Sequence, residues 1–96
     1  MTLSWRAGRP VDTDTAATYA DGIASRVAIP HAVELMHGRV DDMVTVSEGE
    51  LHAAQDELTR ELGITVEGAA AASWAALVAR DRPPGPALVI VTGSNA

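Results

Sequence analysis

Residues 66–80, VEGAAAASWAALVAR, are the stretch of the chain that decides its fold. From Gly68 to Ala79 almost every side chain is small or apolar, so a helix formed here would have hardly any polar face. Such a helix is typical of a position that other elements enclose on all sides. A chain of 96 residues buries only roughly two-thirds of the surface that it exposes when unfolded. We therefore predict a helix over residues 66–80 that belongs inside a larger packed structure.

The residues before this helix predict a strand that leads directly into another helix. Met43–Val46 is a short β-prone run, and Ser47 with Glu50 three residues later forms the pattern of a capping box. Apolar residues then recur at spacings of three and four, and Gly63 is a typical helix stop. The members of this apolar stripe are Leu51, Ala54, Leu58 and Leu62. We expect a surface helix that is half buried.

The residues after the central helix predict a second strand. Residues 87–91, ALVIV, form a continuous apolar run that is typical of a central parallel strand, and the stiff loop Pro83–Pro86 precedes them. The order strand, helix, helix, strand predicts an α/β fold with short parallel strands and packed helices. No linker or domain boundary is visible, so we treat residues 1–96 as a single partial domain.

The first third of the chain carries weaker signals. Residues 1–29 show no sustained hydrophobic period, and we expect a loop there with at most one short strand. Pro30 suits the first position of a helix, and we predict a short helix through Met36 that stops at Gly38. This third is expected to be the least structured part of the chain.

The charge and composition exclude several classes of protein. The net charge is −6, and the seven basic residues are all scattered arginines, which argues against binding to nucleic acid or an anionic membrane surface. The chain has no cysteine, so it forms neither disulfides nor thiolate metal sites. It has no apolar run of the ~18 residues that a membrane span needs and no signal-peptide pattern after Met1. We expect a soluble, cytoplasmic protein.

Neither the histidines nor the aspartates form the pattern of a metal site. His31, His37 and His52 lack the spacing of four that places two histidine ligands on one helix face, so we expect surface residues. Asp12 and Asp14 begin like a calcium-binding loop, but the glycine and the glutamate that such a loop needs at its sixth and twelfth positions are absent. We therefore predict no metal site.

Four segments resemble the C-terminal third of the pyridoxal-phosphate (PLP)-dependent threonine/serine dehydratases. They are Thr18–Ala24 (TYADGIA), Val40–Glu48 (VDDMVTVSE), Val66–Ala71 (VEGAAA) and Val91–Asn95 (VTGSN), and their order and spacing match that family too. These dehydratases share the fold-type II architecture with serine racemase, threonine synthase and the tryptophan synthase β-chain. The resemblance therefore implies the C-terminal part of a fold-type II large domain.

The resemblance also implies a set of cofactor-binding residues. Thr92 and Gly93 take the place of the first two residues of the dehydratases' Ser-Gly-Gly-Asn motif, which implies that the Thr92 hydroxyl binds the pyridine nitrogen of PLP. Ser94 replaces the second glycine, and this affects how closely the backbone approaches the ring. Glu67 matches a glutamate that lies beside the ring. The alternatives are that Thr92 is an ordinary turn residue and that Glu67 is an ordinary carboxylate near a helix N-terminus, where the macrodipole favours it.

Two further features bear on the substrate and the covalent anchor. Asp21-Gly22 resembles the family's Ala-Asp-Gly loop at the mouth of the substrate site, although a plain Asp-Gly turn is an equal alternative. In the family a lysine binds PLP covalently, and a glycine-rich loop holds its phosphate. This chain contains no lysine. The resemblance thus implies non-covalent contacts with PLP and no catalytic residue.

These features support two functions from different classes. The first is a fragment or a split subunit of a lyase that converts an amino acid to a 2-oxo acid and ammonia. It would be inactive alone and completed by an upstream lysine-bearing portion. The second is a non-catalytic module that associates with itself through its apolar faces. A weaker third reading is that residues 87–96 begin a short-chain dehydrogenase. The further glycines, and the acidic residue about 20 positions on, that dinucleotide binding needs are absent.

Overall fold

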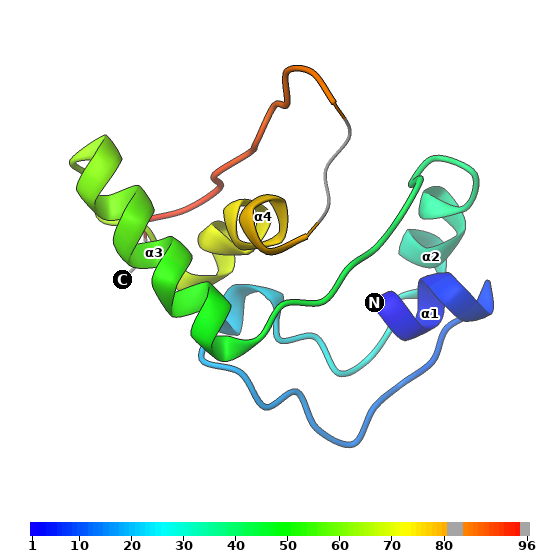
Figure 1. Ribbon diagram of the computed structural model, residues 1–96. Coiled ribbons are helices and arrows are strands. Elements are labelled where there is room, and N and C mark those ends of the chain that lie inside the picture. Colours follow the sequence, from blue (N-terminus) through cyan, green and yellow to red (C-terminus); the bar gives the residue numbers. More distant parts are fainter. Residues whose placement is uncertain (81–83, 95–96) are drawn as a thin grey trace. The chain divides into compact units, whose positions relative to one another are not determined.

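The computed structural model of the chain describes residues 1–80 and 84–94 (Figure 1). Within these residues the elements are four α-helices and one 3-10 turn. In chain order they are α1 (Thr2–Ala7), the 3-10 turn η1 (Asp21–Ile23), α2 (Pro30–Met36), α3 (Glu48–Leu62) and α4 (Gly68–Ala79). They fall into two compact units. The first comprises residues 1–17 and 24–45, and the second comprises residues 18–23 together with the chain from Val46 onward.

The first unit contains α1 and α2, and its most buried residue belongs to α1. The hydroxyl of Ser4 accepts a hydrogen bond from the N–H of Val11 (2.8 Å) and donates one to the carbonyl of Val11 (3.2 Å). Gly8 ends the helix with a left-handed φ of 67°. The loop expected over residues 1–29 was therefore wrong at Thr2–Ala7. A helix of six residues is too short to give a periodic pattern, and only Gly8 marks its end.

The second helix of this unit follows the sequence-based expectation. Pro30 is the first residue of α2, which ends at Met36 as predicted, and Val33 is its one buried residue. Just before it, the carboxylate of Asp12 accepts a hydrogen bond from the N–H of Ala28 (3.0 Å). Asp12 thus has a structural partner inside the protein. Across residues 1–80 and 84–94 no group of three or more metal-ligating side chains is gathered in one place.

The second unit is built on α3 and α4, and α3 forms as its caps predict. The Ser47 hydroxyl accepts from the N–H of Glu50 (3.1 Å), while the Glu50 carboxylate accepts from the N–H of Ser47 (2.9 Å). The helix ends at Gly63, whose φ of 68° is left-handed. The first three members of the apolar stripe, Leu51, Ala54 and Leu58, are buried, whereas Leu62 is exposed.

The last helix, α4, packs against α3 through small side chains. It begins at Gly68 and ends at Ala79, slightly inside the predicted range of residues 66–80. Its buried residues are Gly68, Ala70, Ala71 and Ala75. The enclosure on all sides that the sequence predicts is incomplete within the described residues, because Val78 is 60% exposed. One face of α4 therefore remains open to solvent.

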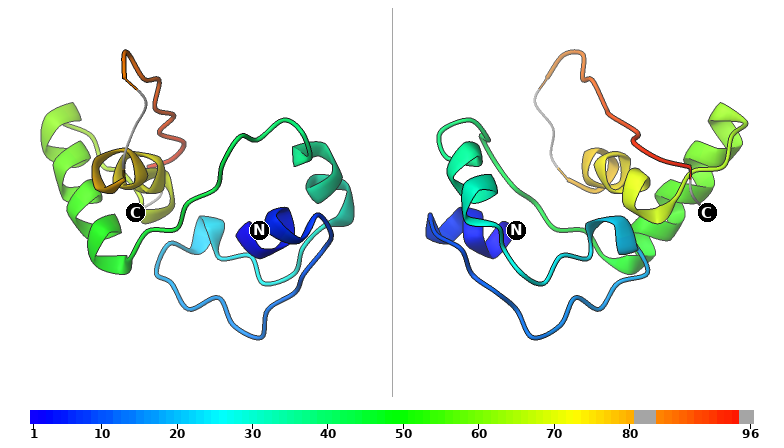
Figure 2. Two further views of the ribbon diagram at one scale, coloured as in Figure 1. Left: turned by 45° about the vertical axis from the view of Figure 1, so that its right-hand side comes forward. Right: turned by 180° about the vertical axis from the view of Figure 1, so that it is seen from behind.

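Neither predicted strand is present in the described residues. Residues 43–46 and 87–91 belong to no strand, and Leu88 is 93% exposed. Figure 2 draws residues 84–94, from orange to red, as irregular backbone without an arrow beside it. A strand forms only beside a neighbour that pairs with its backbone, and the second unit offers 87–91 none among its described residues. Part of the expected Pro83–Pro86 loop, at Pro83, lies outside the described residues.

None of the helices in residues 1–80 and 84–94 is both long enough and apolar enough to cross a membrane. The longest, α3, carries charged residues along its exposed side, and its sequence EGELHAAQDELTREL is amphipathic. The core of the second unit lies between α3 and α4, and the turn η1 packs against α4.

Candidate functional site

Glu67 and Gly93 lie against each other at the N-terminal end of α4. Glu67 is the residue just before the helix, and its N–H donates a hydrogen bond to the carbonyl of Gly93 (3.3 Å). Its carboxyl group occupies the space that a side chain on Gly93 would need, since a Cβ built there would overlap Oε1 and lie 2.7 Å from Cδ. Gly93 does not have a positive φ. Close approach, and not backbone conformation, is therefore what requires glycine at this position.

The residues just before Gly93 also contact the second unit, through a hydrogen bond from α4 and through core packing. The Ser73 hydroxyl donates a hydrogen bond to the carbonyl of Ile90 (2.7 Å), and Val91 packs against the core of the second unit. Between these ties Thr92 is exposed, and its hydroxyl has no hydrogen-bond partner among the described residues. Gly93 is thus held against Glu67, with Thr92 as its exposed neighbour. The last residue of that pattern, Asn95, lies outside the described residues.

The Asp21-Gly22 pair also lies at this end of α4. It forms the turn η1, in which Asp21 is exposed, and a Cβ on Gly22 would lie 3.0 Å from the Cβ of Ala69 in the first turn of α4. Ala20, one residue before the turn, is almost fully buried. The structure therefore brings all five sequence-predicted site residues to one end of one helix, while their chemical roles remain predictions.

Tyr19 is a residue of this region that the sequence analysis did not single out. Its ring stacks on that of His52 with 4.0 Å between ring centroids, and it covers Gly68 so closely that a Cβ there would lie 2.5 Å from Cε2. Its hydroxyl donates to Oε1 of Gln55 (3.0 Å). Partial burial, followed by the nearby carboxylates of Glu48 and Asp56, raises the pKa of Tyr19 above its ordinary value. The sequence could have pointed to Tyr19 because this residue directly precedes the Ala-Asp-Gly segment.

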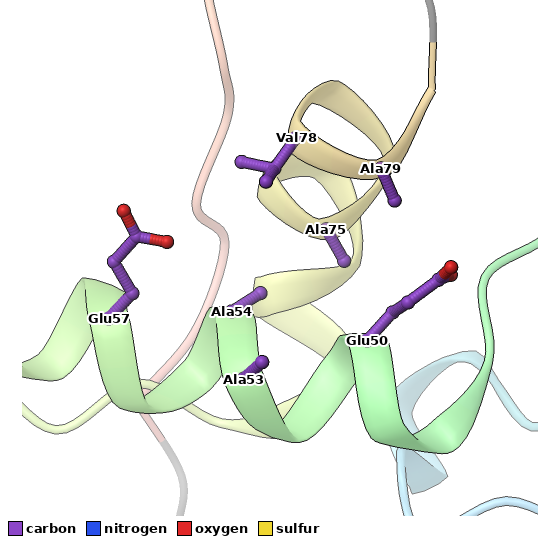
Figure 3. Close-up of a pocket in the computed structure, with 7 residues that line it drawn as sticks. All are labelled: Glu50, Ala53, Ala54, Glu57, Ala75, Val78 and Ala79. Atoms are coloured by element: carbon purple, nitrogen blue, oxygen red, sulfur yellow. The ribbon is translucent and has the colours of Figure 1, made fainter.

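A small pocket lies between α3 and α4, toward the C-terminal end of α4 (Figure 3). Its volume is about 120 Å³. The residues that line it are Glu50, Ala53, Ala54, Glu57, Ala75, Val78 and Ala79. Both acidic side chains are engaged, since Glu50 pairs with Arg80 (3.1 Å) and Glu57 accepts from the indole N–H of Trp74 (3.1 Å). None of the sequence-predicted site residues lines this pocket, so it does not belong to the candidate site.

The histidines make no further site. His31, His37 and His52 are all exposed, as expected, and within residues 1–80 and 84–94 the ring of His52 stacks on that of Tyr19. The arrangement at the N-terminal end of α4 therefore offers one carboxylate, one exposed hydroxyl and a close backbone approach. Such a set can bind and orient a polar ring edge. It contains no lysine amine that could bind a carbonyl group covalently.

Comparison with known proteins gives the class of this chain. A family model described as pyridoxal-phosphate dependent enzyme matches residues 1–93. The chain belongs to this family. The resemblance seen in its sequence is thereby confirmed, and the reading as the start of a short-chain dehydrogenase finds no support.

The chain is also similar to individual proteins. The chain is 34% identical over 97 residues to the biosynthetic L-threonine dehydratase of Lactococcus lactis subsp. lactis, covering 99% of this chain and 23% of the relative. It is 35% identical over 98 residues to the corresponding enzyme of Mycobacterium leprae, with the same two coverages. The crystal structure of the T.th. threonine deaminase matches with a TM-score of 0.75 and 29% identity, over 80% of this chain and 26% of that one. The chain thus spans about a quarter of the length of these relatives.

Proposed function

We propose that this chain is the C-terminal segment of a threonine/serine dehydratase-like catalytic domain and completes its cofactor site. In this role it contributes to the conversion of an amino acid to a 2-oxo acid and ammonia, and it is inactive alone. The observation that carries the proposal is the contact between Glu67 and Gly93, with the exposed hydroxyl of Thr92 beside it. These are the three residues that the family pattern assigns to the cofactor.

The residues present fit one edge of a pyridine ring. PLP, when bound, supplies an electron sink for the electrons released at the substrate α-carbon. The Thr92 hydroxyl has no partner among the described residues and can donate a hydrogen bond to the ring nitrogen. A hydroxyl, unlike a carboxylate, does not hold a proton on that nitrogen, so this partner limits how strongly the ring withdraws electrons. Glu67 would lie beside the ring, and Gly93 lets the backbone come close.

The other proposed contacts lie around the same end of α4. Asp21 and Gly22 would stand at the mouth of the substrate site, since η1 packs on the first turn of the helix. No residue of this chain is assigned a catalytic role, because it carries no lysine and the five candidates bind or orient. The covalent anchor and the phosphate-binding loop would come from a lysine-bearing portion of the enzyme.

The exposed apolar residues of the segment 87–91 support the need for that portion. Leu88 is 93% exposed and Ile90 is 67% exposed. Large apolar side chains exposed so close together often mark a surface that another chain or segment covers. We infer that residues 43–46 and 87–91 become short parallel strands when the lysine-bearing portion supplies neighbours for them. The cytoplasmic location expected from the sequence is part of this proposal.

Complementation tests the proposal. The lysine-bearing part of the Lactococcus lactis dehydratase, deprived of the segment that this chain matches, is mixed with the chain and PLP, and 2-oxo acid formation from threonine and serine is measured. We expect activity that neither part shows alone. Thr92→Ala should lower it at least about tenfold, the loss typical of a hydrogen bond used in catalysis, while Thr92→Ser should retain it. Failure of the two parts to associate, or equal activity of both variants, contradicts the proposal.

The same exposed residues favour a second candidate, a non-catalytic module that associates with itself. A homo-oligomer would cover Leu88, Ile90 and the open face of α4 without any other partner. Analytical ultracentrifugation of the chain with and without PLP separates the two functions. A stable oligomer of one size that PLP leaves unchanged, and that does not complement the truncated dehydratase, would favour this second candidate.

A further inference from the structure

The side chain of Gln55, in the middle of α3, connects two segments that meet beside Glu67. Its Nε2 donates a hydrogen bond to the carbonyl of Val66 (2.7 Å), and its Oε1 accepts one from the hydroxyl of Tyr19 (3.0 Å). Both ends of the amide are therefore used, which fixes the orientation of the group. Val66 is 1% exposed, so its carbonyl bond to Gln55 forms at the edge of the core.

The bond from Gln55 and the bond to Gly93 act on the same peptide unit. The carbonyl of Val66 and the N–H of Glu67 belong to one planar peptide group, which accepts from Gln55 on one side and donates to Gly93 (3.3 Å) on the other. A planar group held at both ends has little freedom to rotate. Its orientation determines where the chain enters α4 and hence where the Glu67 carboxyl lies against Gly93.

The hydrogen bonds form one chain with a single direction. The hydroxyl of Tyr19 donates to the amide of Gln55, this amide donates to the peptide between Val66 and Glu67, and that peptide donates to Gly93. Each amide thus accepts at its oxygen and donates at its nitrogen, an arrangement in which successive bonds polarise and strengthen one another. The chain ends at the residue next to the exposed hydroxyl of Thr92.

The position of Tyr19 is in turn fixed by packing. Its ring lies on Gly68, where a side chain would not fit, and it stacks on the ring of His52 at an interplanar angle of 3°. Its N–H donates to the carboxylate of Glu48 (3.4 Å). These contacts come from parts of the unit that are distant in sequence, residues 18–23 and the helices, and they leave the hydroxyl directed at Gln55.

We propose that Gln55 is a positioning residue of the candidate site: it orients the peptide between Val66 and Glu67 and thereby places Glu67 and Gly93 beside Thr92. The consequence for catalysis rests on the proposed function. The positioning itself concerns contacts within this chain and is measurable without PLP or a partner. A failure of complementation would therefore leave the positioning test unaffected.

The test is amide hydrogen exchange of the 96-residue chain, followed residue by residue by NMR. Gln55→Glu keeps an acceptor for the hydroxyl of Tyr19, but its ionised carboxyl has no hydrogen to donate to Val66. We expect the N–H of Glu67 to exchange about tenfold faster in this variant, the change expected for one lost hydrogen bond. Thr59→Ala, at an exposed position of the same helix, is the control and should leave this amide unchanged.

Acidification adds a readout that a merely structural role would not produce. A protonated glutamic acid carries an O–H that can donate to the carbonyl of Val66. At each pH we compare the exchange rate of the Glu67 amide in Gln55→Glu with the wild-type rate. Below the ordinary glutamate pKa of about 4.3, the ratio of the two rates should return toward one. Persistence of the difference at low pH would contradict the proposed bond.

Several exchange results would overturn the positioning role of Gln55. An unprotected Glu67 amide in the wild type, or equal exchange rates in wild type and Gln55→Glu, overturns the proposal. So does a variant in which the amides of Ala71 and Trp74 accelerate as much as that of Glu67, because Gln55 would then support α4 as a whole. Gln55→Met, which removes both hydrogen bonds and keeps the length of the side chain, should accelerate the Glu67 amide without acid rescue.

In the complemented enzyme the same variant has a kinetic signature. Gln55→Glu should lower kcat while KM changes little, since it displaces a group beside the cofactor and leaves the substrate contacts in place. It should also shift the absorbance of bound PLP, because the surroundings of the ring change. Loss of substrate affinity at constant kcat would contradict a positioning role.

Discussion

Two parts of the second unit, the N-terminal end of α4 and the segment 87–91, differ in how many of their contacts this chain supplies. At the N-terminal end of α4, the N–H of Glu67 donates to the carbonyl of Gly93, the Glu67 carboxyl packs against Gly93, and Gln55 donates to the carbonyl of Val66. The segment that leads there, residues 87–91, is apolar and yet mostly exposed, and the bond from Ser73 is the side-chain hydrogen bond that ties it to α4. The candidate site is therefore organised by contacts within the second unit, whereas residues 87–91, which we propose become a strand, have no pairing neighbour among the described residues.

The largest difference in stability is expected between two leucine substitutions, one in the core and one in the segment 87–91. Leu51→Ala should destabilise the second unit by about 2–5 kcal/mol, because Leu51 is 3% exposed and its loss leaves a cavity. Leu88→Ala should change stability by less than about 0.5 kcal/mol, since that side chain is 93% exposed. Urea unfolding followed by circular dichroism measures both. Similar losses for the two variants would mean that residues 87–91 are already packed in the free chain.

A substitution at Gly93 tests the close packing at the N-terminal end of α4. Gly93→Ala places a methyl group where the carboxyl of Glu67 lies, and we expect a loss of about 1–3 kcal/mol from overpacking. Removing the carboxyl first, as in Glu67→Ala, should make the same change at Gly93 nearly neutral. The double-mutant cycle measures this coupling. Additive losses would show that the two residues do not touch, and Ser94→Ala, at an exposed neighbour, serves as the control.

Acid stability probes the contact between α3 and the end of α4. The hydrogen bond from Arg80, and then that from the N–H of Ser47, lower the pKa of Glu50. A lowered pKa in the folded chain contributes stability that is present above the unfolded value and lost as the pH falls through the folded one. We expect the wild type to lose more thermal stability than Glu50→Gln when the pH is lowered below 4.5. Parallel curves would refute this contribution.

The smallest effect on stability is expected from the ionisation of Tyr19 at alkaline pH. Burial, followed by the charges of Glu48 and Asp56, raises the pKa of Tyr19, so its neutral form is favoured in the folded chain. The stability from this source is present below the ordinary value of 10.0 and is lost as the pH rises through the higher folded one. Tyr19→Phe should therefore lose less stability than the wild type above pH 10.0. Titration of the tyrosinate absorbance, which reports the one tyrosine directly, should give a midpoint above 10.0.

Much of the helical structure was predictable because its signals are local. The pattern of Ser47 and Glu50, with Gly63 at the other end, defines α3 within a few residues, and Pro30 marks the start of α2. The short helix at Thr2–Ala7 was missed because it is less than two turns long. The two strands were wrong for the described residues, since a β-prone run reports a preference that only a neighbouring strand can satisfy.

The candidate site was predictable only in part. Thr92, Gly93 and Glu67 came from the resemblance to a family, and no periodicity would have selected them. The roles of Gln55 and Tyr19 were not predicted because their hydrogen bond joins positions 36 residues apart. A glutamine within a helical pattern does not indicate which residue its side chain binds. The alternative for Glu67, a favourable position near a helix N-terminus, still describes where it stands, since it is the N-cap residue of α4 and makes no side-chain capping bond.

Amide exchange across the second unit, in the free chain and after mixing with the lysine-bearing part of the dehydratase and PLP, measures whether a partner completes residues 87–91 as a strand. We expect the amide of Glu67 to be protected in both states. The amides of residues 87–91 should become protected only in the mixture. Protection of 87–91 in the free chain, or no gain on mixing, would contradict the claim that this segment is a strand completed by a partner.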